Sequence, residues 1–119
     1  MFASPEPQNF SSLSLEGWVP IHKPEGWSSF DVIRFLKRQY KNVKIGHAGT
    51  LDPFATGVLL VGFGRAVRLT DFAMGMLKTY RFTIQWGESR DTDDVTGSCI
   101  KKNGVVPDLN AIQRKLSLF

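Results

Sequence analysis

The sequence has little cysteine and no long apolar run, and each shortage excludes a class of protein. Its single cysteine, Cys99, excludes an internal disulfide framework and a multi-cysteine metal site. Its longest apolar run, residues 58–61, is far shorter than the roughly 18 residues that a membrane span requires. The first residues lack the basic and apolar regions of a secretory signal peptide. We therefore expect a cytoplasmic protein that does not enter a membrane.

Acidic residues are scarce in the centre of the chain. Residues 30–86 hold nine Lys or Arg against three Asp, whereas residues 1–29 carry a net charge of −2 and residues 87–119 are neutral. The whole chain has a net charge of +4 and a pI near 9.5. A basic block attracts polyanions, so nucleic acid is the first partner to test. An ordinary solvated basic face explains the charge equally well.

The 119 residues, 42% of them hydrophobic, suffice for one domain or part of one. Residues 1–15 are rich in Ser, Pro, Asn and Gln and predict a flexible leader. Ser28 and Asp31 form a capping box, which predicts a helix from Phe30 to about Tyr40. Side chains three and four residues apart make one face of this helix basic; they are Arg34, Lys37, Arg38 and Lys41.

The remaining patterns predict a mixture of strands and helices. Pro20 makes a central position in a sheet unfavourable for the first strand. At the other end of the chain, the apolar side of the last helix has no later element to cover it. An incomplete domain, or one that another chain completes, accounts for that bare side. The predicted elements are a strand at 18–22, an irregular loop at 46–53, a strand at 58–63 buried on both faces, a helix at 66–77, a half-buried strand at 80–86, an acidic loop at 88–97 and a helix that Asp108 caps.

The loop at 46–53 is the strongest candidate for chemistry. Asp52 lies in a glycine-rich segment, where the backbone can hold a carboxylate close to a ligand. His47 adds a group whose charge changes near neutral pH. The competing interpretation is structural, because Asp52 and Pro53 also form the N-cap and first-turn pair that opens many helices.

The same loop carries a resemblance to a known family. Its residues, with Ala55, Thr56 and Gly57 after them, resemble the signature of the TruB family of tRNA pseudouridine synthases. Four further segments resemble the family's motifs in order and spacing, with Val67, Arg68 and Arg90 as departures. These segments are Lys23-Pro24-x-Gly26-x-Ser28-Ser29, Gly64-Arg65-Ala66-Val67-Arg68-Leu69, Lys78-Thr79-Tyr80 and Gly87 to Gly97.

The resemblance implies an enzyme that isomerises the T-loop uridine of tRNA, a tRNA pseudouridine(55) synthase that needs no metal or cofactor. Asp52 matches the catalytic nucleophile, and attack at either C1′ of the ribose or C6 of the uracil is compatible with the sequence. Tyr80 matches the aromatic wall of the pocket for the flipped base. His47 and Asp94 match substrate-binding positions, and Lys23 is expected to shape the floor of the pocket. The four basic side chains of the helix are then expected to meet the phosphates of the T-arm stem-loop.

The resemblance also implies an α/β (α+β) fold with a mixed, largely antiparallel sheet flanked by helices. Residues 16–119 match only the N-terminal half of the family's catalytic domain. The second half, which supplies the arginine that pairs with the catalytic aspartate, and the C-terminal RNA-binding domain have no counterpart in the sequence. A second polypeptide could complete the domain. The alternative function is a truncated, non-catalytic RNA-binding remnant of such an enzyme.

Overall fold

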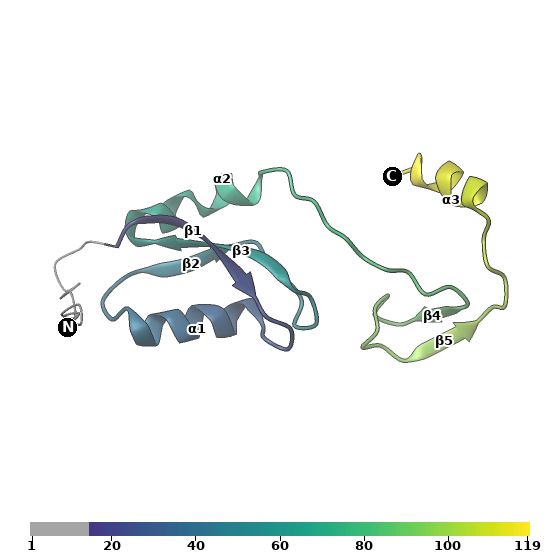
Figure 1. The fold of residues 1–119 in the computed structure, drawn as a ribbon, viewed down its shortest axis with the longest axis horizontal. Helices are drawn as coiled ribbons and strands as arrows, with labels where there is room; N and C mark the ends of the chain where they lie inside the picture. Colours follow the sequence, from purple (N-terminus) through teal and green to yellow (C-terminus); the bar gives the residue numbers. More distant parts are fainter. Residues whose placement is uncertain (1–14) are drawn as a thin grey trace, which may run out of the picture. The chain divides into compact units, whose positions relative to one another are not determined.

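A computed structural model describes residues 15–119, so the predicted leader lies outside the described residues except for Leu15. The chain divides into two compact units, one that ends at Lys78 and one that runs from Thr79 to Phe119. Both units are visible in Figure 1.

The first unit is a three-stranded antiparallel sheet with a helix against one face (Figure 1). The strand order is β1-β3-β2, which places the apolar strand β3 in the centre and the proline-containing β1 at an edge. The elements are β1 (Gly17–Lys23), α1 (Ser29–Gln39), β2 (Ile45–Ala48), β3 (Gly57–Phe63), the 3₁₀ helix η2 (Gly64–Leu69) and α2 (Thr70–Met74).

The core lies between α1 and the sheet, and it forms because apolar residues recur every second position on β3 and at helical spacing on α1. Ile21, Leu36 and Val43 pack around it. Its buried members are Val32, Ile33, Ile45, Leu59, Val61 and Phe63.

The capping box predicted for α1 is confirmed. Ser28 Oγ accepts a hydrogen bond from the Asp31 backbone N–H at 3.1 Å, and the Asp31 carboxylate accepts one from the Ser28 N–H at 2.9 Å. The Ser28 hydroxyl also donates to the Asp31 carboxylate at 2.6 Å. This bond, followed by the one from the Ser28 N–H, holds the pKa of Asp31 at about 2, below its ordinary 3.8. An ionised Asp31 in the first turn also suits the positive end of the helix dipole.

The structure corrects three predictions in this unit. The loop predicted at 46–53 begins only after Ala48, because Gly46 and His47 pair with Gly62 and Val61 in the sheet. The strand at 58–63 is confirmed, but Val58 is 72% exposed, so β3 is not buried on both faces throughout. The helix predicted at 66–77 is a 3₁₀ helix followed by a short α-helix that ends at Met74, with Gly75 as its C-cap.

The second unit contains a two-stranded hairpin and one helix, namely β4 (Glu88–Arg90), β5 (Cys99–Lys102) and α3 (Leu109–Leu116). Asp108 caps α3 by accepting a bond from the Ala111 N–H at 2.7 Å, as predicted. The loop predicted at 88–97 instead starts with β4, because Glu88 to Arg90 pair with β5.

The alternating segment 80–86 does not form the predicted half-buried strand. It has no regular structure, and each of its apolar side chains is at least 42% exposed. A strand is stable only when a neighbour takes its backbone hydrogen bonds, and no strand within residues 15–119 pairs with this segment.

The predicted class, helices combined with antiparallel sheet, is confirmed. Among residues 15–119, none of the helices combines the length and the apolar character needed to cross a bilayer.

Candidate functional site

Asp52 lies on the loop between β2 and β3, and its side chain is exposed. Its carbonyl accepts a hydrogen bond from the Ala55 N–H at 3.0 Å, which closes a turn at residues 53–54. No helix follows this turn, and β3 begins at Gly57. The interpretation of Asp52 and Pro53 as a helix-opening pair is therefore wrong.

Ser29 holds the loop on the N-terminal side of Asp52. Its hydroxyl accepts from the Leu51 N–H at 2.9 Å and donates to the Leu51 carbonyl at 3.2 Å. Ser29 is only 2% exposed, so water does not compete for these bonds. Both backbone groups of the residue before Asp52 are thus bound to the start of α1.

Lys23 and Gly26 hold the loop on the other side. The Pro53 carbonyl accepts from the Lys23 ammonium at 3.2 Å and from the Gly26 N–H at 2.7 Å. Lys23 is completely buried, and it also donates to the carbonyls of Pro24 and Trp27. Gly26 has a φ of +80°, a backbone conformation that residues with a Cβ rarely adopt.

Asp52 is consequently an exposed residue of a loop in which the backbone of both neighbours, Leu51 and Pro53, is anchored. A carboxylate in this position needs little reorganisation before it reacts, because the backbone on each side is already ordered. The three ammonium protons of Lys23 are all used by backbone carbonyls. The Lys23 side chain therefore holds the loop from the interior of the protein and does not face solvent.

His47 lies on β2, shortly before the Asp52 loop, and is half-buried. Its Nδ1 is 2.6 Å from the Gly49 carbonyl oxygen. A carbonyl only accepts, so this bond requires a proton on Nδ1 and leaves Nε2 for another partner.

The four basic side chains predicted on one helix are all exposed, and Arg34, Lys37 and Arg38 lie on α1. Lys41 lies in the turn that follows, because α1 ends at Gln39. Arg34 forms an ion pair with Asp31, and its guanidinium carbon is 5.7 Å from the centre of the Phe30 ring. Lys37, Arg38 and Lys41 have no ion-pair or side-chain hydrogen-bond partner among residues 15–119. The basic face of the helix is thus open to an anionic ligand.

Tyr80 and Asp94 belong to the second unit. Tyr80 is 64% exposed. The Asp94 carboxylate accepts from the Thr96 hydroxyl at 2.6 Å, from the Thr96 N–H at 2.8 Å and from the Thr92 hydroxyl at 2.8 Å. These bonds, the one from the Thr96 hydroxyl above all, lower the pKa of Asp94.

Arg90 organises the loop that carries Asp94, a role that the motif comparison did not reveal. Its guanidinium donates to the carbonyls of Val95 and Gly97 at 3.2 and 2.8 Å. It also binds the Glu88 carboxylate at 2.6 Å, which lowers the pKa of Glu88. A Cβ at Gly97 would overlap the Thr92 hydroxyl, so this position requires glycine.

Sequence reasoning placed Lys23 in the site but missed Ser29 and Gly26 as anchors of the Asp52 loop. The one signal in the sequence for this anchoring role is that Gly26 and Ser29 lie in the same motif as Lys23. The structure brings Lys23, Ser29, His47 and the Asp52 loop together in the first unit.

Comparison of the sequence with known proteins identifies the family to which this chain is related. Residues 37–119 match the family described as TruB family pseudouridylate synthase, N-terminal domain. The chain is 48% identical over 103 residues to tRNA pseudouridine synthase B of Anaplasma phagocytophilum, a match that covers 87% of this chain and 34% of the relative. It is 43% identical over 106 residues to the protein of that name from Rhodospirillum rubrum, covering 89% of this chain and 34% of the relative. The chain thus spans about a third of the length of these curated relatives. With its five motifs in register, it belongs to the TruB family.

Proposed function

We propose that residues 16–119 form the N-terminal half of the catalytic domain of a tRNA pseudouridine(55) synthase. The names of the relatives and the description of the matching family support this function. The remaining part of the domain, whether it comes from the same polypeptide or a second one, would complete the site. The expected substrate is the T-arm stem-loop of tRNA, and the expected compartment is the cytoplasm, where tRNA is found.

Asp52 is the proposed nucleophile. In the reaction the C1′–N1 bond of the target uridine breaks, the uracil turns, and a C1′–C5 bond forms. C5 then loses its proton and N1 gains one, so the conversion is an isomerisation. A carboxylate that holds the sugar or the base covalently during the rotation explains why an aspartate is suited to this step. The observation that carries the proposal is the anchoring of Leu51 and Pro53, which presents Asp52 on an ordered loop.

The other residues have supporting roles in this proposal. Tyr80 would stack on the flipped base, and Asp94 would supply a hydrogen bond near it. His47, with Nε2 as its unused nitrogen, would contact the T-loop. Lys23 would act on the substrate indirectly, through the loop that it holds. The basic face of α1 would bind phosphates and contribute affinity without sequence preference.

The decisive experiment is a tritium-release assay with T-arm stem-loop RNA labelled at C5 of the target uridine. The chain is tested alone and as a chimera, in which it replaces the matching segment of the Rhodospirillum rubrum relative. We expect the chimera to release tritium and Asp52→Asn to abolish the release. The matched control is Asp71→Asn, which neutralises an exposed aspartate on α2.

Release that persists in the Asp52→Asn chimera would remove Asp52 from its proposed role. RNA binding without release by any form of the chain would instead favour the non-catalytic remnant. Salt dependence of that binding would show how many phosphates are contacted.

A further inference from the structure

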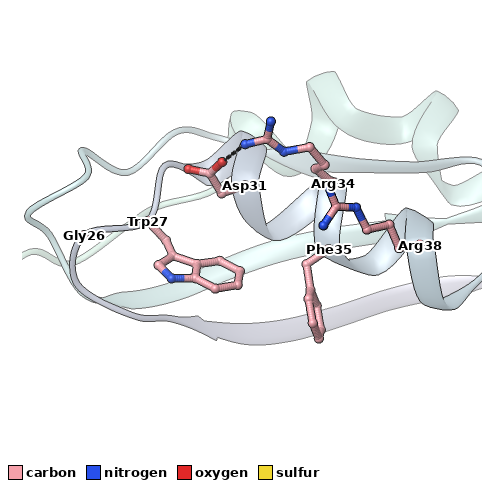
Figure 2. A pocket seen from close by; sticks show the side chains of 6 residues that line it. All are labelled: Gly26, Trp27, Asp31, Arg34, Phe35 and Arg38. Carbon is pink, nitrogen blue, oxygen red and sulfur yellow. Dashed lines mark hydrogen bonds and ion pairs between the residues drawn. The ribbon is translucent and has the colours of Figure 1, made fainter.

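A cleft of about 450 Å³ lies between the turn at Gly26–Trp27 and the outer side of α1 (Figure 2). Its volume is in the range of about 300–1,000 Å³ typical of small-ligand sites. The proposed function uses its arginines only as phosphate contacts and gives no role to its aromatic residues. The lining residues are Gly26, Trp27, Asp31, Arg34, Phe35 and Arg38.

The cleft has an aromatic wall. Figure 2 shows the Trp27 indole reaching from the turn toward Phe35. The two rings meet edge to face, with their centres 5.9 Å apart. Trp27 remains 40% exposed and Phe35 47% exposed. Large exposed rings of this kind are the surfaces on which single-stranded nucleic acids stack their bases.

The charge of the cleft is positive. Asp31 is held by Ser28 and paired with Arg34, so these two charges are already matched. Arg38 has no partner among residues 15–119, and in Figure 2 its guanidinium extends along the helix toward Arg34. Lys37 lies three residues beyond Arg34 on α1, so the helix carries a further exposed basic side chain next to those that line the cleft.

The wall is also held rigidly. The Trp27 carbonyl accepts from the buried Lys23 ammonium at 2.5 Å, and Gly26 donates to Pro53. A preformed aromatic wall lowers the entropic cost of binding a ligand. The same bonds connect this wall to the loop that carries Asp52.

We infer that this cleft binds one unpaired nucleotide of an RNA strand, with its base against Trp27 and its phosphate on Arg38. The inference rests on the proposed function to the extent that RNA is the substrate. To the phosphate contacts already proposed for the basic face of α1 it adds a stacking contact on Trp27, which requires a single-stranded nucleotide. An uncharged apolar protein segment would match the aromatic rings but not the unpaired basic charge beside them.

The test measures binding of the full chain to hexauridylate and to an abasic hexamer with the same phosphates, by fluorescence anisotropy. We expect the uridylate to bind at least about 5-fold more tightly, because one stacked base contributes that much. Trp27→Ala should abolish the preference, whereas Trp27→Phe should retain it. Arg38→Gln should weaken both ligands equally and reduce the salt slope by about 1.

The matched control for Arg38→Gln is Arg114→Gln, which removes one exposed arginine from the second unit and should weaken the binding of both hexamers less than Arg38→Gln does. Near-ultraviolet circular dichroism checks that the Trp27 variants remain folded. Equal binding of the two hexamers, or a preference that survives Trp27→Ala, would overturn the inference.

The two proposals fail separately. A chimera that releases tritium while Trp27 has no effect on binding would overturn the cleft alone. A preference that depends on Trp27, in a chimera that releases no tritium, would overturn the enzymatic function alone.

Discussion

The Lys23 ammonium donates a hydrogen bond to the Pro53 carbonyl, 30 positions along the chain. This bond joins the end of β1 to the residue that follows Asp52. Together with the bonds between Ser29 and Leu51, it orders a loop that lies outside the sheet. Two segments that are separate in the sequence, Lys23 to Ser29 and Gly49 to Thr56, therefore form one structural unit around Asp52.

Replacing Lys23 by Met should lower the free energy of unfolding of the chain by about 3 kcal/mol, because hydrogen bonds from a charged donor contribute about 1.5–3 kcal/mol each and three carbonyls would lose this donor. Chemical denaturation followed by circular dichroism measures the loss. Lys44→Met removes an exposed lysine and is the control. An equal effect of the two substitutions would show that the bonds to Pro24, Trp27 and Pro53 do not stabilise the fold.

Replacing Ser29 by Ala should release the N-terminal side of the Asp52 loop. We expect faster hydrogen exchange at the Leu51 amide and a free energy of unfolding lower by about 1–2 kcal/mol, since two bonds are lost in a buried site. Ser89→Ala, at an exposed position on β4, should change neither quantity. Unaltered protection of the Leu51 amide would contradict the anchoring role of Ser29.

Lowering the pH should destabilise the first turn of α1 over the range in which Asp31 takes up a proton. The pKa of Asp31 is lowered from 3.8 to about 2 in the folded chain. Its stabilising effect is therefore complete above the unfolded value and is lost as the pH falls through the folded value. NMR titration of the Asp31 carboxyl carbon should show this midpoint and a parallel loss of helical shifts.

Ser28→Ala tests the cause of that shift. Because the Ser28 hydroxyl is the largest contributor, its removal should move the Asp31 midpoint upward toward the ordinary value. An unchanged midpoint in this variant would mean that the capping bonds do not stabilise the carboxylate. Asp71→Asn, on α2, should leave the titration of Asp31 as it is.

Removing the basic face of α1 should weaken binding of T-arm RNA and flatten its salt dependence. Each phosphate contact contributes about 0.7–0.9 to the slope, so neutralising four contacts should reduce it by about 3. The variant carries Gln at Arg34, Lys37, Arg38 and Lys41.

The matched control for that variant removes the same charge from the second unit, with Gln at Lys101, Lys102, Arg114 and Lys115, which are all exposed. A smaller change in slope is expected for the control. Equal changes would indicate attraction by net charge alone and would contradict a specific role of the helix.

Patterns confined to a few neighbouring residues predicted their elements correctly. The capping box at Ser28 and Asp31, the cap at Asp108 and the apolar run of β3 all act over one helical turn or one strand. Elements that need a partner were predicted less well. The alternation at 80–86 would suit a strand, but no strand of the described chain pairs with it. Gly46 and His47 were predicted to lie in an irregular loop, yet they form part of β2 because they pair with Gly62 and Val61 of β3.

The sequence by itself determined the family, the candidate nucleophile Asp52 and the basic face of α1, because motif spacing and helical periodicity are properties of neighbouring residues. Only the tertiary structure decided that Ser29 and Lys23 anchor the Asp52 loop, and that Trp27 and Arg38 line a cleft. The anchoring bonds span 22 and 30 positions along the chain. Such contacts depend on the path of the backbone between the two partners, and local patterns in a single sequence do not specify that path.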